Sequence, residues 1–392
     1  MKTPFACALI LLVGCNNGGA VATDVDGGGG DLGSEADLVT SPSLDSGLCT
    51  ATITTAGIGC SYAHDALNNS PSVNAESKVA WACAQGQRTV TGNGLPDHDV
   101  GTFPNPNCPN TISAQNVSAS MTLTPVSTGT ANRVQPSGYA WNGVKFDPGT
   151  AGTCTENNGQ TSCSLIGNTG SWNIEALGQS SFDFGVDSNN AHVQPTGAYH
   201  YHGMPTGLIA NLGKGQAMTL VGFAMDGFPI YARYGYSNAN DATSAIKVIT
   251  SSYRLKATPD ANRPPTSTYP MGAFSEDYEY VAGLGDLDEC NGRTGVTPEF
   301  PCGIYHYYIT DTYPFIQRCV KGTAQNGGGG MGPRNCTSGA DCAGACPPGS
   351  KGCGCATTPM GMMCIPTCGA SSDCPAGPMG GALQCRNGFC VP

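Results

Sequence analysis

Two histidines lie in a Tyr-His-Tyr-His run at residues 199–202, and a near copy with one histidine lies at residues 305–308. Side chains alternate between the two faces of an extended strand. A strand at the first run would therefore place His200 and His202 on one face and both tyrosines on the other. Imidazole nitrogens are common ligands of zinc, copper, iron and nickel. We expect His200, His202 and the histidine of the second run, His306, to converge on one metal ion.

The segments that must position these residues have the pattern of strands. Residues 138–146 form a hairpin pattern about Asn142-Gly143, and residues 217–225 are an apolar run that ends at a turn signal, Asp226-Gly227. Stretches with a helical period are scarce, and the best of them covers residues 74–85. We therefore predict a mainly β domain, built as a sandwich or a distorted barrel.

The first 14 residues have the form of a lipoprotein signal peptide. Lys2 precedes an apolar stretch that is too short to span a bilayer, and Leu12-Val13-Gly14-Cys15 has the form of a bacterial lipobox. This resemblance implies cleavage before Cys15 and lipid on its sulfur, and an ordinary cleaved signal is the alternative. Asn16 follows where retention in the inner membrane usually needs Asp. We expect a lipoprotein of the outer membrane or the cell surface, held by its lipid.

Residues 15–47 have the composition of a tether. They include a run of four glycines and six acidic residues, with no basic or aromatic residue. Such a segment cannot bury enough apolar surface to offset its chain entropy. We expect a flexible spacer between the membrane and a folded domain at residues 48–322.

The net charge of −11 excludes the function classes that need a basic surface. A nucleic-acid partner requires a basic footprint, and docking on anionic lipid requires positive charge. We expect no nucleic-acid partner, and attachment to a membrane only through the lipid.

The 21 cysteines suit an oxidising compartment. Nine lie between Cys49 and Cys319, so one of them is free, bridged to the tail or paired with another chain. Our predicted pairs are Cys154 with Cys163 and Cys290 with Cys319.

The C-terminal end has the composition of a separate module. Residues 323–335 form a glycine-rich hinge, and residues 336–392 form a module with ten cysteines and no histidine, for which we predict disulfides in place of zinc. The module resembles short cysteine-rich repeats of bacterial surface proteins, which implies contact with a surface protein or a polysaccharide.

Four segments together resemble the YHYH domain family. They run from Asp187 to Gly203, from Gly94 to Pro104, from Val221 to Tyr231, and from Leu287 to Arg293 with Tyr305-His306-Tyr307 beyond it. The matches cover most of the chain from His98 to Gly322. The family is named for its motif, so the resemblance implies no particular reaction. Tyr308 stands where a full second copy of the motif would have a histidine.

The candidate metal ligands are the histidines and two acids inside these landmarks: His98, His192, His200, His202, His306, Asp226 and Glu289. Imidazoles suit copper or zinc, and a carboxylate would make a mixed site open to water. The alternative is a buried polar network in which the histidines bond backbone and hydroxyl groups. The simplest interpretation of Asp226-Gly227 is a hairpin turn. Glu289 is the candidate general base that would act on a metal-bound water.

Two classes of function remain. The first is a surface-anchored protein that binds copper or zinc, with a metal-dependent hydrolase or oxidase as its enzymatic variant. The second is a structural or adhesive surface protein whose histidines only pack. The sequence shows no serine nucleophile elbow, phosphate loop or dinucleotide fingerprint.

Overall fold

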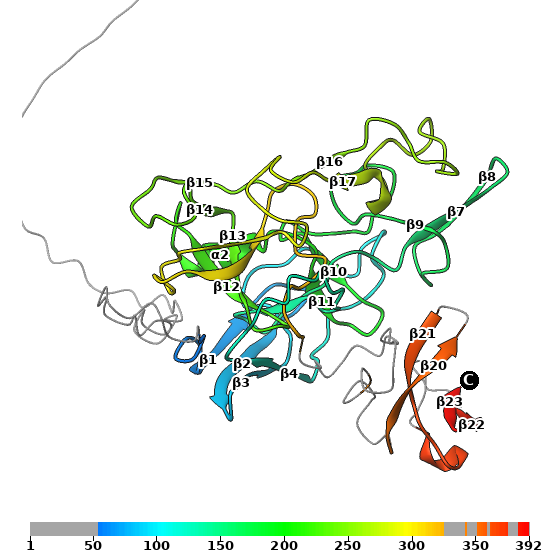
Figure 1. Ribbon diagram of the computed structural model, residues 1–392, viewed down its shortest axis with the longest axis horizontal. Helices are drawn as coiled ribbons and strands as arrows, with labels where there is room; N and C mark the ends of the chain where they lie inside the picture. Colours follow the sequence, from blue (N-terminus) through cyan, green and yellow to red (C-terminus); the bar gives the residue numbers. More distant parts are fainter. Residues whose placement is uncertain (1–53, 325–341, 343–350, 359–360, 375–382, 392) are drawn as a thin grey trace, which may run out of the picture. The chain divides into compact units, whose positions relative to one another are not determined.

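The protein is represented by a computed structural model that describes residues 54–324, 342, 351–358, 361–374 and 383–391 (Figure 1). The predicted signal peptide, Cys15, the tether and most of the predicted hinge lie outside the described residues. No helix in the described ranges is long and apolar enough to cross a membrane.

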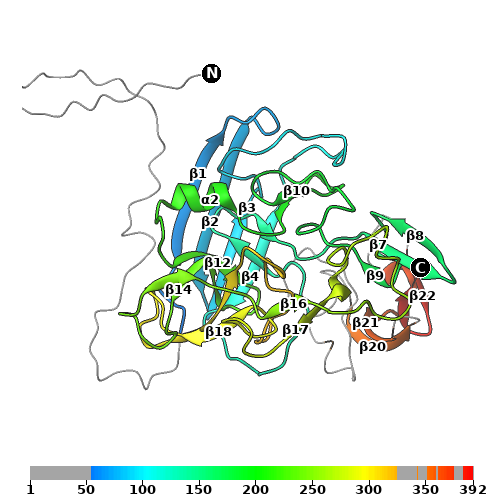
Figure 2. The same cartoon turned by 90° about the horizontal axis from the view of Figure 1, so that it is seen from above.

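An antiparallel four-stranded sheet has the strand order β1-β2-β3-β4 (Figure 2). Its strands are β1 (Ser61–Asn68), β2 (Ala75–Ala84), β3 (Gln87–Gly92) and β4 (Val117–Thr122). The prediction of a helix at residues 74–85 is wrong, because this segment is β2. Buried Ser77, Val79 and Trp81 alternate with more exposed neighbours, which is the period of a strand that is buried on one face.

An eight-stranded sheet has the order β10-β11-β6-β5-β12-β13-β19-β18. Its strands are β5 (Gly138–Ala140), β6 (Lys145–Phe146), β10 (Ala191–Val193), β11 (Tyr199–Tyr201), β12 (Thr219–Ala224), β13 (Pro229–Ala232), β18 (Gly292–Gly295) and β19 (Ile304–Ile309). The predicted hairpins about Asn142-Gly143 and Asp226-Gly227 are confirmed as β5–β6 and β12–β13.

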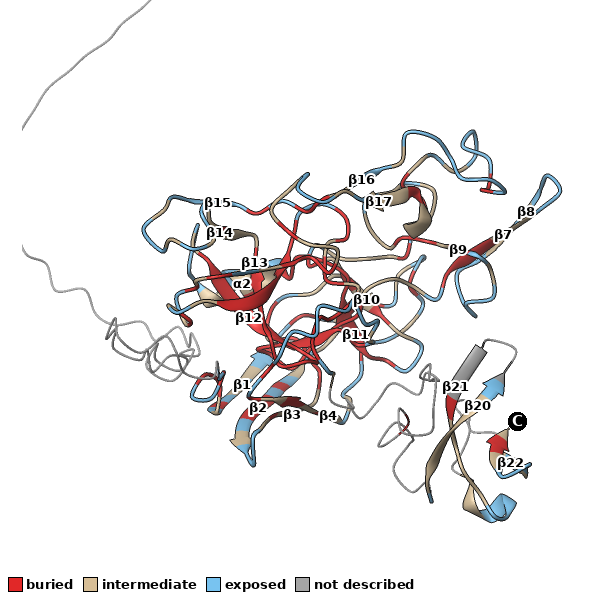
Figure 3. Cartoon of the chain, in the orientation of Figure 1, coloured by how far each residue is buried: buried red, intermediate tan, exposed pale blue. Residues whose placement is uncertain are grey.

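The two sheets pack face to face around one apolar core. The rings of Trp81 and Trp141 lie 5.3 Å apart between centroids, and the indole nitrogen of Trp81 donates to the carbonyl oxygen of Trp141 over 3.0 Å. The guanidinium carbon of Arg88 lies 3.5 Å from the centre of the Phe223 ring. Strands β12 and β13 are buried along their whole length, which explains their continuous apolar sequences (Figure 3). The mainly β fold class is confirmed, and none of the described sheets closes into a barrel.

The two halves of the eight-stranded sheet repeat one topology. In chain order, β5–β6 and β10–β11 make the first half, and β12–β13 and β18–β19 make the second. In each half the last strand, β11 or β19, runs parallel to β6 or β13. The halves meet where β5 pairs antiparallel with β12, with Tyr139 opposite Phe223. The sheet therefore has an approximate two-fold axis between β5 and β12.

Smaller elements connect these strands. They are the sheet of β7 (Thr153–Asn157), β8 (Gln160–Ser164) and β9 (Trp172–Asn173), the pair β14 (Tyr234–Tyr236) and β15 (Ile246–Val248), the pair β16 (Tyr253–Leu255) and β17 (Tyr278–Tyr280), the helix α2 (Thr206–Leu212) and a 3-10 helix at Ser275–Asp277. The helix α2 ends at Gly213 in the left-handed conformation, which glycine adopts without steric cost.

Disulfides join elements of the large domain. The predicted pairs Cys154–Cys163 and Cys290–Cys319 are both confirmed, and Cys60–Cys83 is a third bridge. Cys302 is also disulfide-bonded, whereas Cys108 is free and buried. A free cysteine was one of the three possibilities that the odd number of cysteines between Cys49 and Cys319 left open, and Cys108 is such a residue.

The C-terminal module contains two small β-ribbons. Strand β20 (Cys353–Thr358) pairs with β21 (Gly361–Pro366), β22 (Gln384–Arg386) pairs with β23 (Phe389–Val391), and a 3-10 helix covers Ser371–Asp373. Its described disulfides are Cys342–Cys364, Cys368–Cys385 and Cys374–Cys390. The prediction of a disulfide-rich module is confirmed.

Candidate metal centre

The hairpin β10–β11 presents three histidines on one face of the eight-stranded sheet. His192 in β10 lies directly opposite His200 in β11, so both side chains point to the same side. His202 follows two residues later on that side. Gly197, with φ of 85°, turns the chain between the strands, and the backbone N–H of His202 donates to the carbonyl oxygen of Asn190 over 2.8 Å. The hairpin register therefore brings the three imidazoles together.

The three imidazole rings of this histidine triad form a nearly equilateral group. Each pair of ring centroids among His192, His200 and His202 is separated by 4.7 Å. One nitrogen from each ring lies within 4.8 Å of the others. Nitrogen ligands about 2 Å from a zinc ion in tetrahedral geometry lie about 3.3 Å apart. Small side-chain rotations would therefore bring all three nitrogens to one ion.

Backbone carbonyl groups fix the orientation of two rings. The Nδ1 of His192 lies 2.8 Å from the carbonyl oxygen of Phe184, and the Nδ1 of His200 lies 3.2 Å from that of Ala198. A carbonyl oxygen only accepts, so both Nδ1 atoms carry the proton and both Nε2 atoms have a free lone pair. A hydrogen bond from one ring nitrogen to a carbonyl group is the usual second contact of a metal-bound histidine.

His202 lacks any such contact. Its side chain is buried, and neither of its ring nitrogens has a hydrogen-bond partner within the part of the chain that the structure describes. An unsatisfied polar group in a protein interior costs roughly 1–3 kcal/mol. A metal ion bound to one of its nitrogens would remove part of this cost.

Burial keeps the histidine triad neutral. It lowers the pKa of His200 to about 3, against the opposing effect of Asp147, and it lowers the pKa of His202 well below the usual range. Burial lowers the pKa of His192 as well, although this edge-strand residue is partly exposed. Metal coordination requires neutral imidazole, so the triad needs no deprotonation near pH 7 before it binds an ion.

Asp147 supplies a negative charge next to the triad, and the sequence reasoning missed it. It follows β6, the neighbour of β11, and its carboxylate accepts from the Nζ of Lys145 over 2.8 Å and the Nε2 of Gln194 over 2.9 Å. Burial alone would raise the pKa of Asp147, but the charge of Lys145 and hydrogen bonds from Lys145 and Gln135 bring it below the usual value. Its place depends on a strand pairing that no local sequence pattern reveals.

His98 lies on the opposite face of β11, with the tyrosines. Its Nε2 is 2.6 Å from the hydroxyl oxygen of Tyr201, and its Nδ1 is 2.9 Å from the carbonyl oxygen of Asp99. The predicted separation of tyrosines and histidines onto two faces is confirmed, since the rings of Tyr199 and Tyr201 contact each other. His98 therefore belongs to a polar network and not to the histidine triad.

His306 does not join the triad, so the expected convergence of His200, His202 and His306 is wrong. Four strands separate β11 from β19 in the sheet, which corresponds to about 24 Å. The Nδ1 of His306 lies 2.9 Å from the carbonyl oxygen of Ile304, and its Nε2 lies 3.3 Å from the hydroxyl oxygen of Tyr308. Both ring nitrogens thus have partners inside the protein, as the polar-network alternative required.

The two acidic candidates also have partners elsewhere. Buried Asp226 accepts from the hydroxyl group of Tyr307 over 2.7 Å and from the N–H of Gly322 over 2.8 Å. Glu289 forms an ion pair with Lys321. The structure does not bring either carboxylate into the histidine triad, because Asp226 lies in the turn between β12 and β13 and Glu289 lies just before β18, both in the second half of the domain.

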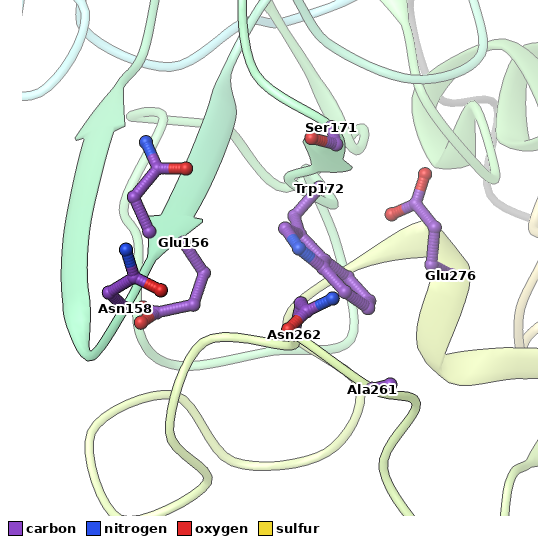
Figure 4. Close-up of a pocket in the computed structure, with 8 residues that line it drawn as sticks. Glu156, Asn158, Ser171, Trp172, Ala261, Asn262 and Glu276 are labelled. Carbon is purple, nitrogen blue, oxygen red and sulfur yellow. The ribbon is translucent and has the colours of Figure 1, made fainter.

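Two other features lack the free donor atoms of a metal site. Cys368, Cys374 and Cys390 lie close together, but their sulfurs are committed to disulfides. A pocket beside Trp172 is lined by Glu156 and Glu276, which accept hydrogen bonds from Thr161 and from the backbone of Asn173 (Figure 4). Neither feature combines convergent, unpaired donor atoms as the histidine triad does.

Fold and site together define a two-sheet β-sandwich domain with a largely buried histidine triad on a hairpin. The sequence model of the YHYH protein family matches residues 118–322, and the chain belongs to this family. The matched range contains the whole eight-stranded sheet, both Tyr-His-Tyr runs and the triad. No curated protein and no solved structure matches the chain.

Proposed function

We propose that this YHYH protein binds one transition-metal ion, copper or zinc, through His192, His200 and His202. The observation that carries the proposal is the geometry of the triad. Three neutral imidazoles, two of them buried, bring a nitrogen each within 4.8 Å of the others, and His202 has no hydrogen-bond partner among the described residues.

The donor set favours copper or zinc over calcium or magnesium. Calcium and magnesium prefer oxygen ligands, whereas neutral imidazole suits zinc and copper. Three histidines leave room for a fourth ligand on a tetrahedral zinc ion. The buried carboxylate of Asp147 offsets part of the charge that the ion would bring.

We further propose that the protein is exported and anchored by lipid on Cys15. The lipobox-like sequence before Cys15 and the disulfides of both folded parts support this placement. The C-terminal module would then be displayed to a surface protein or a polysaccharide, while the YHYH domain holds the metal.

Elemental analysis of the exported full chain tests metal binding. We expect about one copper or zinc ion per wild-type chain and at least a tenfold loss of affinity in His200→Gln, since one of three ligands is removed. The matched control is His306→Gln, which replaces the equivalent buried imidazole in the second half of the sheet and should keep the ion.

A wild-type chain that stays free of metal after copper and zinc are supplied would contradict the proposal. Equal loss of metal in His200→Gln and His306→Gln would also contradict it, because it would place the effect in folding and not in ligation.

A further inference from the structure

We infer that Arg293, His306 and Tyr308 form a second copy of the histidine site, in which a built-in guanidinium group takes the place of the metal ion. The inference rests on the proposed function of the first site. It follows from the two-fold repeat of the sheet, whose halves can be compared residue by residue.

The backbones of the two sites correspond in register. His192 lies opposite His200 in the pair β10–β11, and Arg293 lies opposite His306 in the pair β18–β19. The residues two positions before His192 and Arg293 are asparagines with φ of 54° and 59°. The carbonyl oxygen of Asn190 accepts from the N–H of His202 over 2.8 Å, and the carbonyl oxygen of Asn291 accepts from the N–H of Tyr308 over 2.9 Å.

The side chains that support the two hairpins correspond as well. Tyr199 donates to Asp187 over 2.7 Å in the first half, and Tyr305 donates to Asp288 over 2.8 Å in the second. These two aspartates also bind the N–H groups at equivalent places in their loops, over 2.9 Å in both halves.

The first hairpins of the two halves share a sequence pattern. Gly-Tyr-Ala-Trp-Asn-Gly at residues 138–143 corresponds to Gly-Phe-Ala-Met-Asp-Gly at residues 222–227. Asn142 donates to the hydroxyl oxygen of Tyr201 over 2.9 Å, and Asp226 accepts from the hydroxyl group of Tyr307 over 2.7 Å. The frameworks around the two sites therefore share a sequence pattern, a backbone arrangement and equivalent hydrogen-bonded pairs.

The two sites differ at two of their three positions. The first has His192, His200 and His202, and the second has Arg293, His306 and Tyr308 in the same order. Both buried central histidines direct Nδ1 to the carbonyl oxygen two residues earlier, over 3.2 Å at His200 and 2.9 Å at His306. In the first site, the Nε2 of His200 would face an ion. In the second site, the Nε2 of His306 lies 3.3 Å from the hydroxyl oxygen of Tyr308.

The guanidinium group of Arg293 completes the second site. Its Nη2 donates to the hydroxyl oxygen of Tyr308 over 3.2 Å and to the carbonyl oxygen of Tyr236 over 2.8 Å, and its central carbon lies 5.2 Å from the centre of the Tyr308 ring. A cation over an aromatic face is favourable. Both halves thus accommodate positive charge on this face of the sheet, one through a fixed side chain and the other through a bound ion.

A substitution in each direction tests the correspondence in the full chain, with zinc as the probe. The forward variant, Arg293→His with Tyr308→His, should raise the bound zinc from one to two ions per chain. Its control, Arg293→Gln with Tyr308→Phe, removes the same groups without adding imidazole and should stay at one. The reverse variant, His192→Arg with His202→Tyr, should bind no zinc and should melt at the same temperature with and without a chelator.

The outcomes separate this inference from the function on which it rests. A wild-type chain that binds neither zinc nor copper contradicts the proposed function. One ion in both the wild type and a folded forward variant leaves that function standing and overturns the second site. If the forward variant does not fold, the reverse variant is the test. A reverse variant that is unfolded, or that zinc still stabilises, overturns the inference.

Discussion

At the scale of single residues, the partner of Nε2 separates the histidines of this domain into two kinds. In His98 and His306, Nε2 contacts a tyrosine hydroxyl group, and these residues belong to polar networks. In His192 and His200, a carbonyl group holds Nδ1, which leaves Nε2 with a free lone pair, and both residues belong to the triad that His202 completes. The same residue type thus has a structural role in one place and a ligand geometry in another.

His306 should make the metal-free domain less stable in acid. Burial lowers the pKa of His306 to about 3, so the unfolded chain, with a pKa near 6.5, binds a proton that the folded chain does not. The free energy of unfolding therefore falls as the pH falls from about 7 toward 3, and this single group accounts for roughly 2 kcal/mol of the loss by about pH 5.

Denaturant titrations of metal-free wild type and His306→Gln at pH 7.5 and pH 5 measure this contribution. The wild type should lose about 2 kcal/mol more than the variant, because the other buried histidines are common to both. Equal losses in the two proteins would show that His306 is protonated without cost in the folded state.

The residue pattern predicted part of this chemistry and missed the rest. The separation of His200 and His202 from the tyrosines was predictable, since it follows from the alternation of a strand. The choice of His192 over His306 as the third member was not, because it depends on strand order. The turn at residues 194–197 is the local signal that could have indicated the pairing of His192 with His200, since the two histidines are eight residues apart, as in a short hairpin.

At the scale of elements, the two central strands of the large sheet approach each other unusually closely. A Cβ added at Gly138 would lie 2.5 Å from the carbonyl oxygen of Phe223, and one added at Gly222 would lie 2.1 Å from that of Tyr139. These two glycines occupy equivalent positions on either side of the two-fold axis. Their lack of side chains allows the two halves of the sheet to join.

Gly138→Ala should therefore destabilise the domain by about 3 kcal/mol, since its methyl group would meet backbone atoms that cannot move aside alone. The control is Gly129→Ala, where nothing lies within 4 Å and only the positive φ of 73° opposes the change, at about 1 kcal/mol. Urea unfolding of both variants gives the comparison. A Gly138→Ala variant as stable as the control would contradict the close approach.

Local signals decided which elements could be predicted. The hairpins about Asn142-Gly143 and Asp226-Gly227 were predicted, because turn chemistry and apolar runs are local. The prediction of a helix at residues 74–85 was wrong because several alanines obscure the alternation of apolar and polar residues in this segment. Its pairing with β1 and β3 fixes it as a strand.

At the scale of the whole molecule, the chain combines a duplicated sheet with disulfides that close neighbouring segments. The pair Cys154–Cys163 was predictable from its separation of 9 residues, and the pair Cys290–Cys319 from its position on either side of the second Tyr-His-Tyr run. The order of the eight strands was not, since it joins segments from β5 to β19 through contacts that no local pattern specifies. This non-local order also determines which histidines meet.

The proposed anchor at Cys15 gives a prediction for the entire protein. In a bacterial host the wild type should sediment with membranes, because lipid on the sulfur stabilises attachment by about 0.8 kcal/mol for each buried methylene group. The Cys15→Ser variant should remain exported but appear in the soluble fraction. Membrane association of Cys15→Ser equal to that of the wild type would contradict lipidation at this residue.

Anomalous diffraction from crystals of the zinc-loaded protein, recorded on both sides of the zinc edge, would test the metal site most directly. We predict one strong peak about 2.0–2.1 Å from a ring nitrogen of each of His192, His200 and His202. No peak is expected beside Arg293, His306 and Tyr308. A zinc-loaded crystal with no peak at the triad, or with its strong peak at other residues, would contradict the assignment.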